Sequence, residues 1–385
     1  GFFTDEPQYY RWGTPYTPAA EAEFEKDGED IREGLIWLFV HDERGYRFRE
    51  KYYKTLNKLY VENFYKKIYD WCGAHNCKLT GHSVEEVALY TQMWGGAAVM
   101  PSYEYEDIPG MDCLGRFCCT ELPVKQVANA AEQLGKKRVL TETFGCSGYD
   151  VTPKELKSVA EMQYFGGVNV MCQHLYPYSV AGRGRIDHPP VFGPHGNWNE
   201  GFKAFNDYFA RLSYIVANTE EKAKIGVIHP MRDIWLDYVR SEDYESVKRT
   251  EEDFNEFLRV LRKNGVEYQL IDERILERHG KAEGKNLRVG NCVYDTVIVP
   301  KMRNISGTTY EILKQYGGKL CVLQTPVFLD GVREKLSLAS NITLEKIIAD
   351  RRIKFTCEDG NSVLTARNGS IGEFIFIKNT SYTEE

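Results

Sequence analysis

The chain has 385 residues, which is enough for two or three domains with a sizeable hydrophobic core. Hydrophobic residues make up 42% and charged residues 27%, the composition of an ordinary globular protein, and the formal net charge is −7. This charge, without a basic block to neutralise phosphates, argues against a nucleic-acid partner, and the lack of a long apolar run argues against a membrane-spanning protein.

A short strand pattern opens the chain at Gly1–Thr4 and ends at two carboxylates, Asp5 and Glu6. A domain does not usually begin inside an active-site strand, so we expect an N-terminal part to be missing, through cloning or because the polypeptide is a fragment. A polar loop follows, and then a short helix is expected over Asp30–Val40. Apolar residues spaced by three and four predict a long amphipathic helix over Tyr46–Cys72.

Strand and helix patterns then alternate up to residue 217. The further strand patterns are Cys77–Gly81, Gly95–Met100, Lys137–Thr141 and Gly167–His174. The helix patterns are a segment capped by Ser83, then Val124–Leu134, Val151–Gly166 and Phe202–Val216. Strands followed by helices five times over indicate a parallel α/β fold. We therefore predict the C-terminal five strands or so of a (β/α)8 TIM-type barrel, with about three strands absent before Gly1.

The helix over Val151–Gly166 has a well-marked start. Thr152 is the expected N-cap, Pro153 takes the first helical position, and Glu155 completes a capping box. A glycine-rich loop precedes this helix and follows an apolar run that ends at Glu142. Glu142 is therefore expected at the carboxyl end of a buried strand, on the barrel face where catalytic residues collect.

The second half of the chain has its own alternation, after a polar linker expected at Asn218–Lys224. Strands are predicted at Lys224–His229, Tyr268–Ile271, Tyr294–Pro300 and Lys319–Gln324, and helices at Glu251–Lys263 and Thr308–Tyr316. This pattern indicates a flavodoxin-like α/β domain, and no G-x-G-x-x-G sequence opens a helix to make it a nucleotide site. From Ile353 onward a period of two, with a turn at Asn368-Gly369, indicates the start of a β-sandwich.

The predicted domains are thus a partial catalytic barrel over residues 1–219, a flavodoxin-like domain over 220–340 and the start of a sandwich over 341–385. Each barrel strand is followed by chemically active side chains. These are Asp5 and Glu6, His82, the acidic segment from Glu104 to Asp112, Glu142 and His174.

Two carboxyls on different strands of one barrel can flank a glycosidic bond. One protonates the leaving oxygen, and the other activates water or attacks the sugar. Glu6 and Glu142 are therefore the catalytic candidates. The alternative is that one or both acids form structural ion pairs, and that the histidines satisfy backbone groups and do not contact substrate.

A long loop, Tyr176–Trp198, mixes aromatic, basic and acidic residues with prolines, which suggests binding. Its candidate substrate-binding residues are Tyr176, Tyr178, Arg183, Arg185, Asp187, His188 and Trp198. Aromatic faces stack on pyranose rings, and charged side chains bond sugar hydroxyls. Asp5, His82, Glu104, Asp112 and His174 complete the predicted substrate-binding set. The alternative is an ordered lid that only faces solvent.

The carboxylates from Glu104 to Asp112 are also candidate ligands for Ca²⁺, although their spacing matches no EF-hand loop, and no other cofactor is expected. The ten cysteines are scattered without paired C-x-x-C spacing, which indicates reduced thiols and not a disulfide framework or zinc site. With no recognisable signal peptide, a cytoplasmic location is expected unless the missing N-terminal part carries one.

Several segments together resemble large bacterial glycoside hydrolases, the closest group being the α-L-rhamnosidase family 106 and its relatives. The segments are GFFTDEP, KLYVENFYKKIYDWC followed by KLTGH, YEDIPGMD, KKRVLTETFG, GVNVMCQHLYPYS and GRIDHPP. The resemblance covers roughly residues 1–217. It implies a (β/α)8 barrel whose two catalytic glutamates match Glu6 in TDEP and Glu142 in TETFG, an inverting mechanism and a Ca²⁺ ion near the sugar. The second domain resembles the flavodoxin-like domain of β-galactosidase-type barrels.

The predicted function is hydrolysis of a glycosidic bond in a plant or microbial oligo- or polysaccharide, with an α-L-rhamnoside as the first substrate to test. Glu6 is the expected general acid and Glu142 the expected general base. One alternative is a retaining, β-galactosidase-like hydrolase with Glu142 as nucleophile, and another is a non-catalytic carbohydrate-binding protein on a degenerate barrel. The smaller α/β domain offers a surface for a homo-oligomer. If nothing replaces the absent strands, the polypeptide alone is expected to be inactive.

Overall fold

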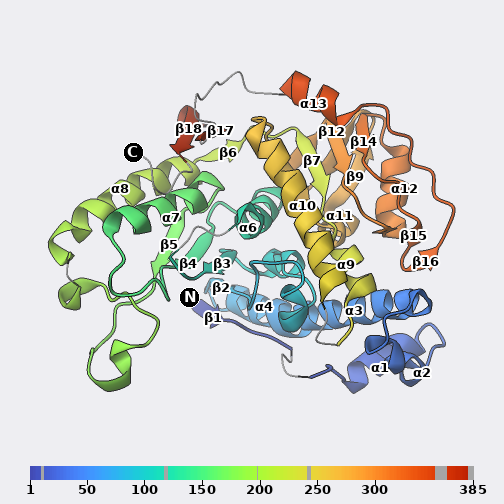
Figure 1. The fold of residues 1–385 in the computed structure, drawn as a ribbon, viewed down its shortest axis with the longest axis horizontal. Helices are drawn as coiled ribbons and strands as arrows, with labels where there is room; N and C mark the ends of the chain where they lie inside the picture. The colour runs from blue at the N-terminus through green and yellow to red at the C-terminus, as the bar shows by residue number, and fades with distance from the viewer. Residues whose placement is uncertain (10–12, 117–119, 197, 241–243, 352–361, 380–385) are drawn as a thin grey trace.

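The computed structural model describes residues 1–9, 13–116, 120–196, 198–240, 244–351 and 362–379 (Figure 1). Five short parallel strands form the wall around the candidate site: β1 (Phe2–Asp5), β2 (Leu79–His82), β3 (Gly110–Cys113), β4 (Leu140–Thr143) and β5 (Val170–Gln173). β1 pairs with β2, and β3, β4 and β5 pair in that order. A parallel bridge between Thr80 and Ile108 joins the two groups. Consecutive parallel strands are the arrangement of a β/α barrel wall.

The register of these strands sets which side chains lie level with one another. Asp5 is paired with His82, and Glu142 is paired with Asp112 on one side and Cys172 on the other. Register partners in a parallel sheet point to the same face, so these residues form one layer at the carboxyl ends of the strands.

Helices connect and cover the strands. They are α1 (Pro18–Glu25), α2 (Ile31–Gly34), α3 (Tyr46–Tyr60), α4 (Lys66–Ala74), α5 (Gln92–Gly95), α6 (Glu121–Gln133), α7 (Pro153–Phe165) and α8 (Asn199–Ala217). A π-helical turn at Val61–Tyr65 joins α3 to α4, so the long helix predicted over Tyr46–Cys72 is confirmed as one continuous segment. Short 3₁₀ turns occur at Leu35–Leu38, Glu43–Gly45, Met100–Tyr105, Gly182–Arg185 and Gly193–His195.

Two predictions between β2 and β3 are wrong. No helix starts at Ser83: residues 84–91 form turns, Glu85 has a φ of 57°, and the next helix is α5. The strand predicted at Gly95–Met100 is not one, since Ala97 has a φ of 63° and a 3₁₀ turn begins at Met100. Those apolar residues are buried by tertiary packing alone. The third strand is β3, whose sequence GMDC has low strand propensity and overlaps the end of the acidic segment from Glu104 to Asp112.

The start of α7 follows the sequence prediction. The Thr152 hydroxyl accepts a hydrogen bond from the amide of Glu155, and the Glu155 carboxylate accepts one from the amide of Thr152. Pro153 occupies the first helical turn, where its missing N–H costs nothing. This capping box fixes the point at which the chain leaves the loop after Glu142 and turns back along the barrel wall.

The second half contains a parallel sheet in the order β14-β12-β7-β8. These strands are β7 (Ile225–Ile228), β8 (Gln269–Ile271), β12 (Thr296–Val299) and β14 (Lys319–Val322), and they lie at the upper right in Figure 1. The associated helices are α9 (Met231–Asp237), α10 (Glu245–Lys263), α11 (Glu273–His279), α12 (Gly307–Gln315) and α13 (Leu344–Arg351). Small antiparallel or mixed sheets are formed by β9 (Gly280–Glu283), β10 (Asn286–Val289) and β11 (Cys292–Tyr294), and by β13 (Asn304–Ile305), β15 (Phe328–Leu329) and β16 (Val332–Arg333).

The predicted linker contains a strand. β6 (Thr219–Glu221) pairs antiparallel with β17 (Ser362–Gly369), which pairs with β18 (Gly372–Asn379). The hairpin turn is at residues 370–371, two positions beyond the predicted Asn368-Gly369, because those residues still pair across the ladder. Of the predicted sandwich strands, the one at residues 353–359 lies outside the described residues. The domain boundaries at 219/220 and 340/341 stay predictions.

One buried apolar cluster runs from the barrel wall into the second α/β sheet, with members such as Met111, Val127, Trp235 and Val297. α3 packs directly on α9, and the indole of Trp235 donates a hydrogen bond to the carbonyl of Ala97 at 2.7 Å. None of the helices within the described ranges has the length and apolarity needed to cross a bilayer.

Candidate active site

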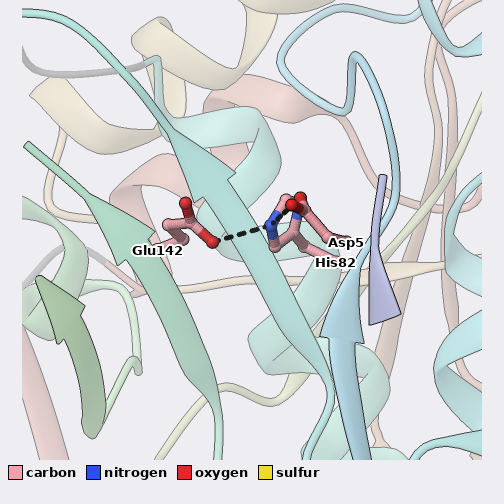
Figure 2. A group of neighbouring side chains, drawn as sticks. All are labelled: Asp5, His82 and Glu142. Atoms are coloured by element: carbon pink, nitrogen blue, oxygen red, sulfur yellow. Dashed lines mark hydrogen bonds and ion pairs between the residues drawn. The ribbon is translucent and has the colours of Figure 1, made fainter. Parts of the chain in front are cut away.

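Side chains from four strands meet at the carboxyl edge of the barrel wall: Asp5 from β1, His82 from β2, Asp112 from β3 and Glu142 from β4. Figure 2 shows His82 reaching towards Glu142 and Asp5. The His82 Nε2 donates a hydrogen bond to Glu142 Oε2 at 2.9 Å and lies 3.4 Å from Asp5 Oδ1. Because Asp5 and Glu142 are 137 positions apart in the sequence, only the parallel strand order brings them together.

His82 is the buried cation of this group. Burial alone lowers the pKa of an imidazole, but the hydrogen bond that His82 donates to Glu142 and the charges of Glu86, Asp112 and Glu142 outweigh it and raise the pKa of His82 to about 10. The same hydrogen bond lowers the pKa of Glu142, with burial opposing. At neutral pH the pair is therefore an imidazolium beside a carboxylate.

Asp112 has the opposite character. Burial raises the pKa of Asp112 to about 7, His82 opposes this, and the nearby charges of Glu142, Glu6 and Asp5 add to the increase. Its Oδ1 is buried and has no hydrogen-bond partner among the described residues. A protonated or half-protonated carboxyl thus stands next to the ionised Glu142.

Glu6 follows β1 directly. It is exposed, and its φ of 45° turns the chain away from the strand direction. Its charge contributes to the raised pKa of Asp112, as does that of Glu142, so both predicted catalytic acids lie within electrostatic range of the same carboxyl.

Two further histidines face Glu142 from its other side. His174 Nε2 lies 4.0 Å from Glu142 Oε1, and the charges of both His174 and His188 favour the ionised form of Glu142. The rings of His174 and His188 meet edge to face at 5.8 Å. His188 Nδ1 also lies 2.9 Å from Cys146 Sγ in the loop after β4. The base of the predicted binding loop therefore returns to the site.

The rest of that loop lies farther out. The loop extends away from the body of the chain, at the lower left in Figure 1. Tyr176, Tyr178 and Arg185 are exposed. Arg183 and Asp187 are also exposed. The Tyr149 hydroxyl donates a hydrogen bond to the carbonyl of Arg185. Trp198 is half-buried against Phe192, with ring centroids 5.5 Å apart, and its substrate contact stays a prediction.

Glu104 does not join the site, which corrects its prediction as a substrate contact. It lies before β3 and pairs with Arg278 and His279 of α11. The other acids of the predicted Ca²⁺ segment are also bound by the protein. Glu106 accepts a hydrogen bond from the amide of Gly110, and Asp107 pairs with Lys78. These carboxylates do not converge, and Ca²⁺ stays a prediction.

Within the described ranges, ligand-type atoms of Asp5, His82 and Glu142 lie within 4.8 Å of one another. This donor set fits Ca²⁺ poorly, because Ca²⁺ takes six to eight oxygen ligands and here one of three donors is an imidazole nitrogen. His82 Nε2 also pairs with both carboxylates. We therefore describe the group as an ion-paired cluster.

Sequence reasoning missed three residues here: Glu86, Cys146 and Cys172. Glu86 is buried behind His82, and Cys172 is level with Glu142 on β5. The position of Cys172 could have been found from the pairing of β4 with β5, which sets it beside Glu142. No sequence pattern marks Glu86, because its contacts depend on a turn that the sequence pattern assigned to a helix.

Comparisons with known proteins define the class of fold. The rhamnosidase from Novosphingobium sp. PP1Y superimposes with a TM-score of 0.71 at 17% identity, over 94% of this chain and 38% of that one. A GH42 β-galactosidase from G. stearothermophilus gives 0.57 at 10% identity, over 98% and 59% of the two chains. An exo-carrageenase GH42 from Bacteroides ovatus gives 0.54 at 11%, over 98% and 61%. The chain thus has the α/β fold of TIM-barrel glycoside hydrolases, as predicted.

Sequence similarity is more limited. The chain is 28% identical over 216 residues to a Formosa agariphila protein whose name provisionally describes a β-glucuronidase, covering 54% of this chain and 16% of that protein. No protein-family model matches. The chain spans less than two thirds of the length of each of these proteins.

Proposed function

We propose that this chain carries the catalytic residues of a glycoside hydrolase. The observation that carries the proposal is Glu142, held ionised by His82 beside the raised-pKa carboxyl of Asp112. This acid pair lies at the carboxyl ends of barrel strands, where such enzymes build their sites. The folds of the similar proteins and the names they carry support the same class.

Glu142 acts as the base or nucleophile in this proposal. An acid with a lowered pKa is deprotonated at working pH, so it can activate water or attack the anomeric carbon, and it is a poor proton donor. Its negative charge also stabilises the oxocarbenium-like transition state. Glu6 remains the proposed general acid. It directly follows β1, and it faces solvent, into which the leaving group departs.

The stereochemical outcome depends on the distance between the two catalytic carboxyls in the substrate complex. About 5–5.5 Å implies retention through a covalent intermediate, and about 6.5–9.5 Å leaves room for water and implies inversion. We propose inversion, with Glu142 as general base. Proton NMR of the first-released anomer decides between the two.

The proposed substrate is an α-L-rhamnoside within a plant or microbial oligo- or polysaccharide. The named activities of the similar proteins make β-galactosides and β-glucuronides the next candidates. Hydrolysis of the three p-nitrophenyl glycosides by the polypeptide that carries this chain ranks them. Adding EDTA and then Ca²⁺ to the same assay tests the predicted cofactor.

The decisive variant is Glu142→Gln, which keeps the shape of the side chain and removes its negative charge. We expect kcat to fall about 10²–10⁴-fold, with an unchanged circular dichroism spectrum. Glu104→Gln is the matched control, because that acid lies on a barrel segment but bonds Arg278 and His279. Wild-type turnover by Glu142→Gln would exclude the assignment.

A carbohydrate-binding protein is the second candidate. The exposed Tyr176 and Tyr178 favour it, because they extend an aromatic surface beyond the acid pair. Calorimetric titration with oligosaccharides, followed by chromatography of the mixture, separates the two: binding without cleavage products supports this candidate and contradicts the hydrolase.

A further inference from the structure

Glu86 is a buried carboxyl in the turn between β2 and α5, and it does not face the open edge of the barrel. One of its oxygens accepts a hydrogen bond from the amide of Ser83, the residue after His82. Its other oxygen accepts one from the amide of Asp112 at 3.0 Å. One side chain thus ties the end of β2 to the end of β3, and so fixes two of the residues that surround Glu142.

The backbone around Glu86 is itself held. The Glu86 carbonyl accepts a hydrogen bond from the Gln126 amide group of α6 at 3.2 Å. Gln126 also accepts a hydrogen bond from Gln92 of α5 through its oxygen at 2.9 Å. A helix on the outside of the barrel therefore anchors the turn, and the turn presents the carboxylate inward.

The charge of Glu86 acts on His82. Burial raises the pKa of Glu86 to about 8, with His82 and the two amides opposing. Its charge is in turn one of the causes that raise the pKa of His82. The other titratable groups that face these two residues are Asp5 on β1, Asp112 on β3, Glu142 on β4, Glu106 before β3, and the buried Tyr60, Tyr65 and Tyr103.

We propose that Glu86 is a positioning residue for the hydrolase: its carboxyl group joins the ends of β2 and β3, sets the placement of His82 and Asp112 around Glu142 and, when ionised, favours the cationic form of His82. This inference rests on the proposed function of Glu142. Glu86 is buried, and it acts through the strand ends that it joins.

The test is Glu86→Gln in the polypeptide that carries this chain, assayed on the p-nitrophenyl glycoside that the wild type cleaves best. A glutamine has one acceptor oxygen and places an N–H₂ group against the second amide, so one strand end loses its bond. We expect kcat to fall about 10²-fold with little change in KM, because small misplacements of catalytic groups cost that much. We also expect the alkaline limb of the kcat profile to move to lower pH, because Glu86 is ionised above about pH 8 and loss of its negative charge lowers the pKa of His82.

Glu106→Gln is the matched control. Glu106 is an equally buried carboxyl that accepts a hydrogen bond from the amide of Gly110 at the other end of β3, so its loss should reproduce the stability cost. Burial raises the pKa of Glu106 well above its usual value, so Glu106→Gln removes little negative charge from the surroundings of His82. Equal kcat and pH profiles for the two variants would overturn the proposal. So would a loss of kcat in Glu86→Gln without any shift of the alkaline limb, because that outcome leaves Glu86 a structural role alone.

Two measurements keep the test independent of other failures. NMR titration of the His82 ring, assigned with His82→Asn, reports its pKa without turnover, and an unchanged value in Glu86→Gln contradicts the proposal. If Glu86→Gln does not fold, Glu86→Asp replaces it in the test. Aspartate keeps the negative charge but is too short to reach the amides of both Ser83 and Asp112. We therefore expect kcat to fall while the pKa of His82 stays high. Glu142→Gln is run in parallel, and turnover retained there removes the hydrolase assignment, whatever Glu86 does.

Discussion

His82 is a buried imidazole whose polar neighbours at the site are carboxylates: Asp5, Glu86, Asp112 and Glu142. The sequence predicted Glu142 correctly at a strand end, because an apolar run followed by glycines marks that place. The sequence also predicted His82 at a strand end, but it did not predict that His82 is the hydrogen-bond partner of Glu142. An ion pair between strands β2 and β4 depends on the curvature of the wall, which no local pattern encodes.

Replacement of His82 by glutamine should change how stability depends on pH. The pKa of His82 rises from its ordinary 6.5 to about 10 on folding, so its contribution is full below about pH 6.5 and is lost as the pH rises towards 10. We expect the wild type to lose on the order of 5 kcal/mol more unfolding free energy than His82→Gln across this window. Urea denaturation at several pH values measures this, and parallel curves for the two proteins would contradict it.

At the scale of elements, those with local signals were predicted well. The capping box of α7 and the amphipathic spacing of α3 are written in neighbouring residues, and both appear in the structure. β3 and β6 were missed, because GMDC and TEE have no strand pattern and acquire their pairing from partners already in place. A strand was wrongly predicted at Gly95–Met100, because a buried apolar segment that pairs with no strand has the same sequence pattern as a buried strand.

Thr152→Ala tests the importance of the α7 cap. Loss of the hydroxyl leaves the amide of Glu155 without its acceptor, and we expect about 1 kcal/mol lower unfolding free energy. Thr152→Ser keeps the acceptor and should stay within about 0.5 kcal/mol of the wild type. Chemical denaturation of both variants is the measurement, and equal losses would show that the hydroxyl contact contributes nothing.

On the scale of the whole molecule, a buried arginine joins the barrel to the second α/β unit. Arg232 of α9 binds Glu50 of α3, Glu277 of α11 at 2.8 Å and Asp330 at 2.9 Å. Burial opposes its charge, but these carboxylates and Glu273 outweigh it and raise the pKa of Arg232. The neutral-pH fold therefore depends on a buried cation shared by helices far apart in sequence.

Arg232→Met removes that cation and leaves the buried carboxylates of Glu50 and Glu273 uncompensated. We expect a loss of about 3–5 kcal/mol in unfolding free energy, measured by urea denaturation at pH 7. Arg259→Met is the control, because Arg259 forms an exposed ion pair with Glu256 on α10, and its loss should cost less than about 1 kcal/mol. A similar small loss for Arg232→Met would mean that this network does not hold the two units together.

The sequence by itself determined the alternation of strands and helices, the acids that follow the apolar runs, and thereby the parallel α/β class. These follow from spacing and capping, which act over a few residues. The tertiary structure decided which acids meet. Strand register sets Asp112 beside Glu142. Glu104 forms an ion pair with Arg278, and Glu86 accepts a hydrogen bond from the residue that follows His82. The reason is physical: burial and charge pairing between distant segments set ionisation and geometry, and neither exists until the chain is folded.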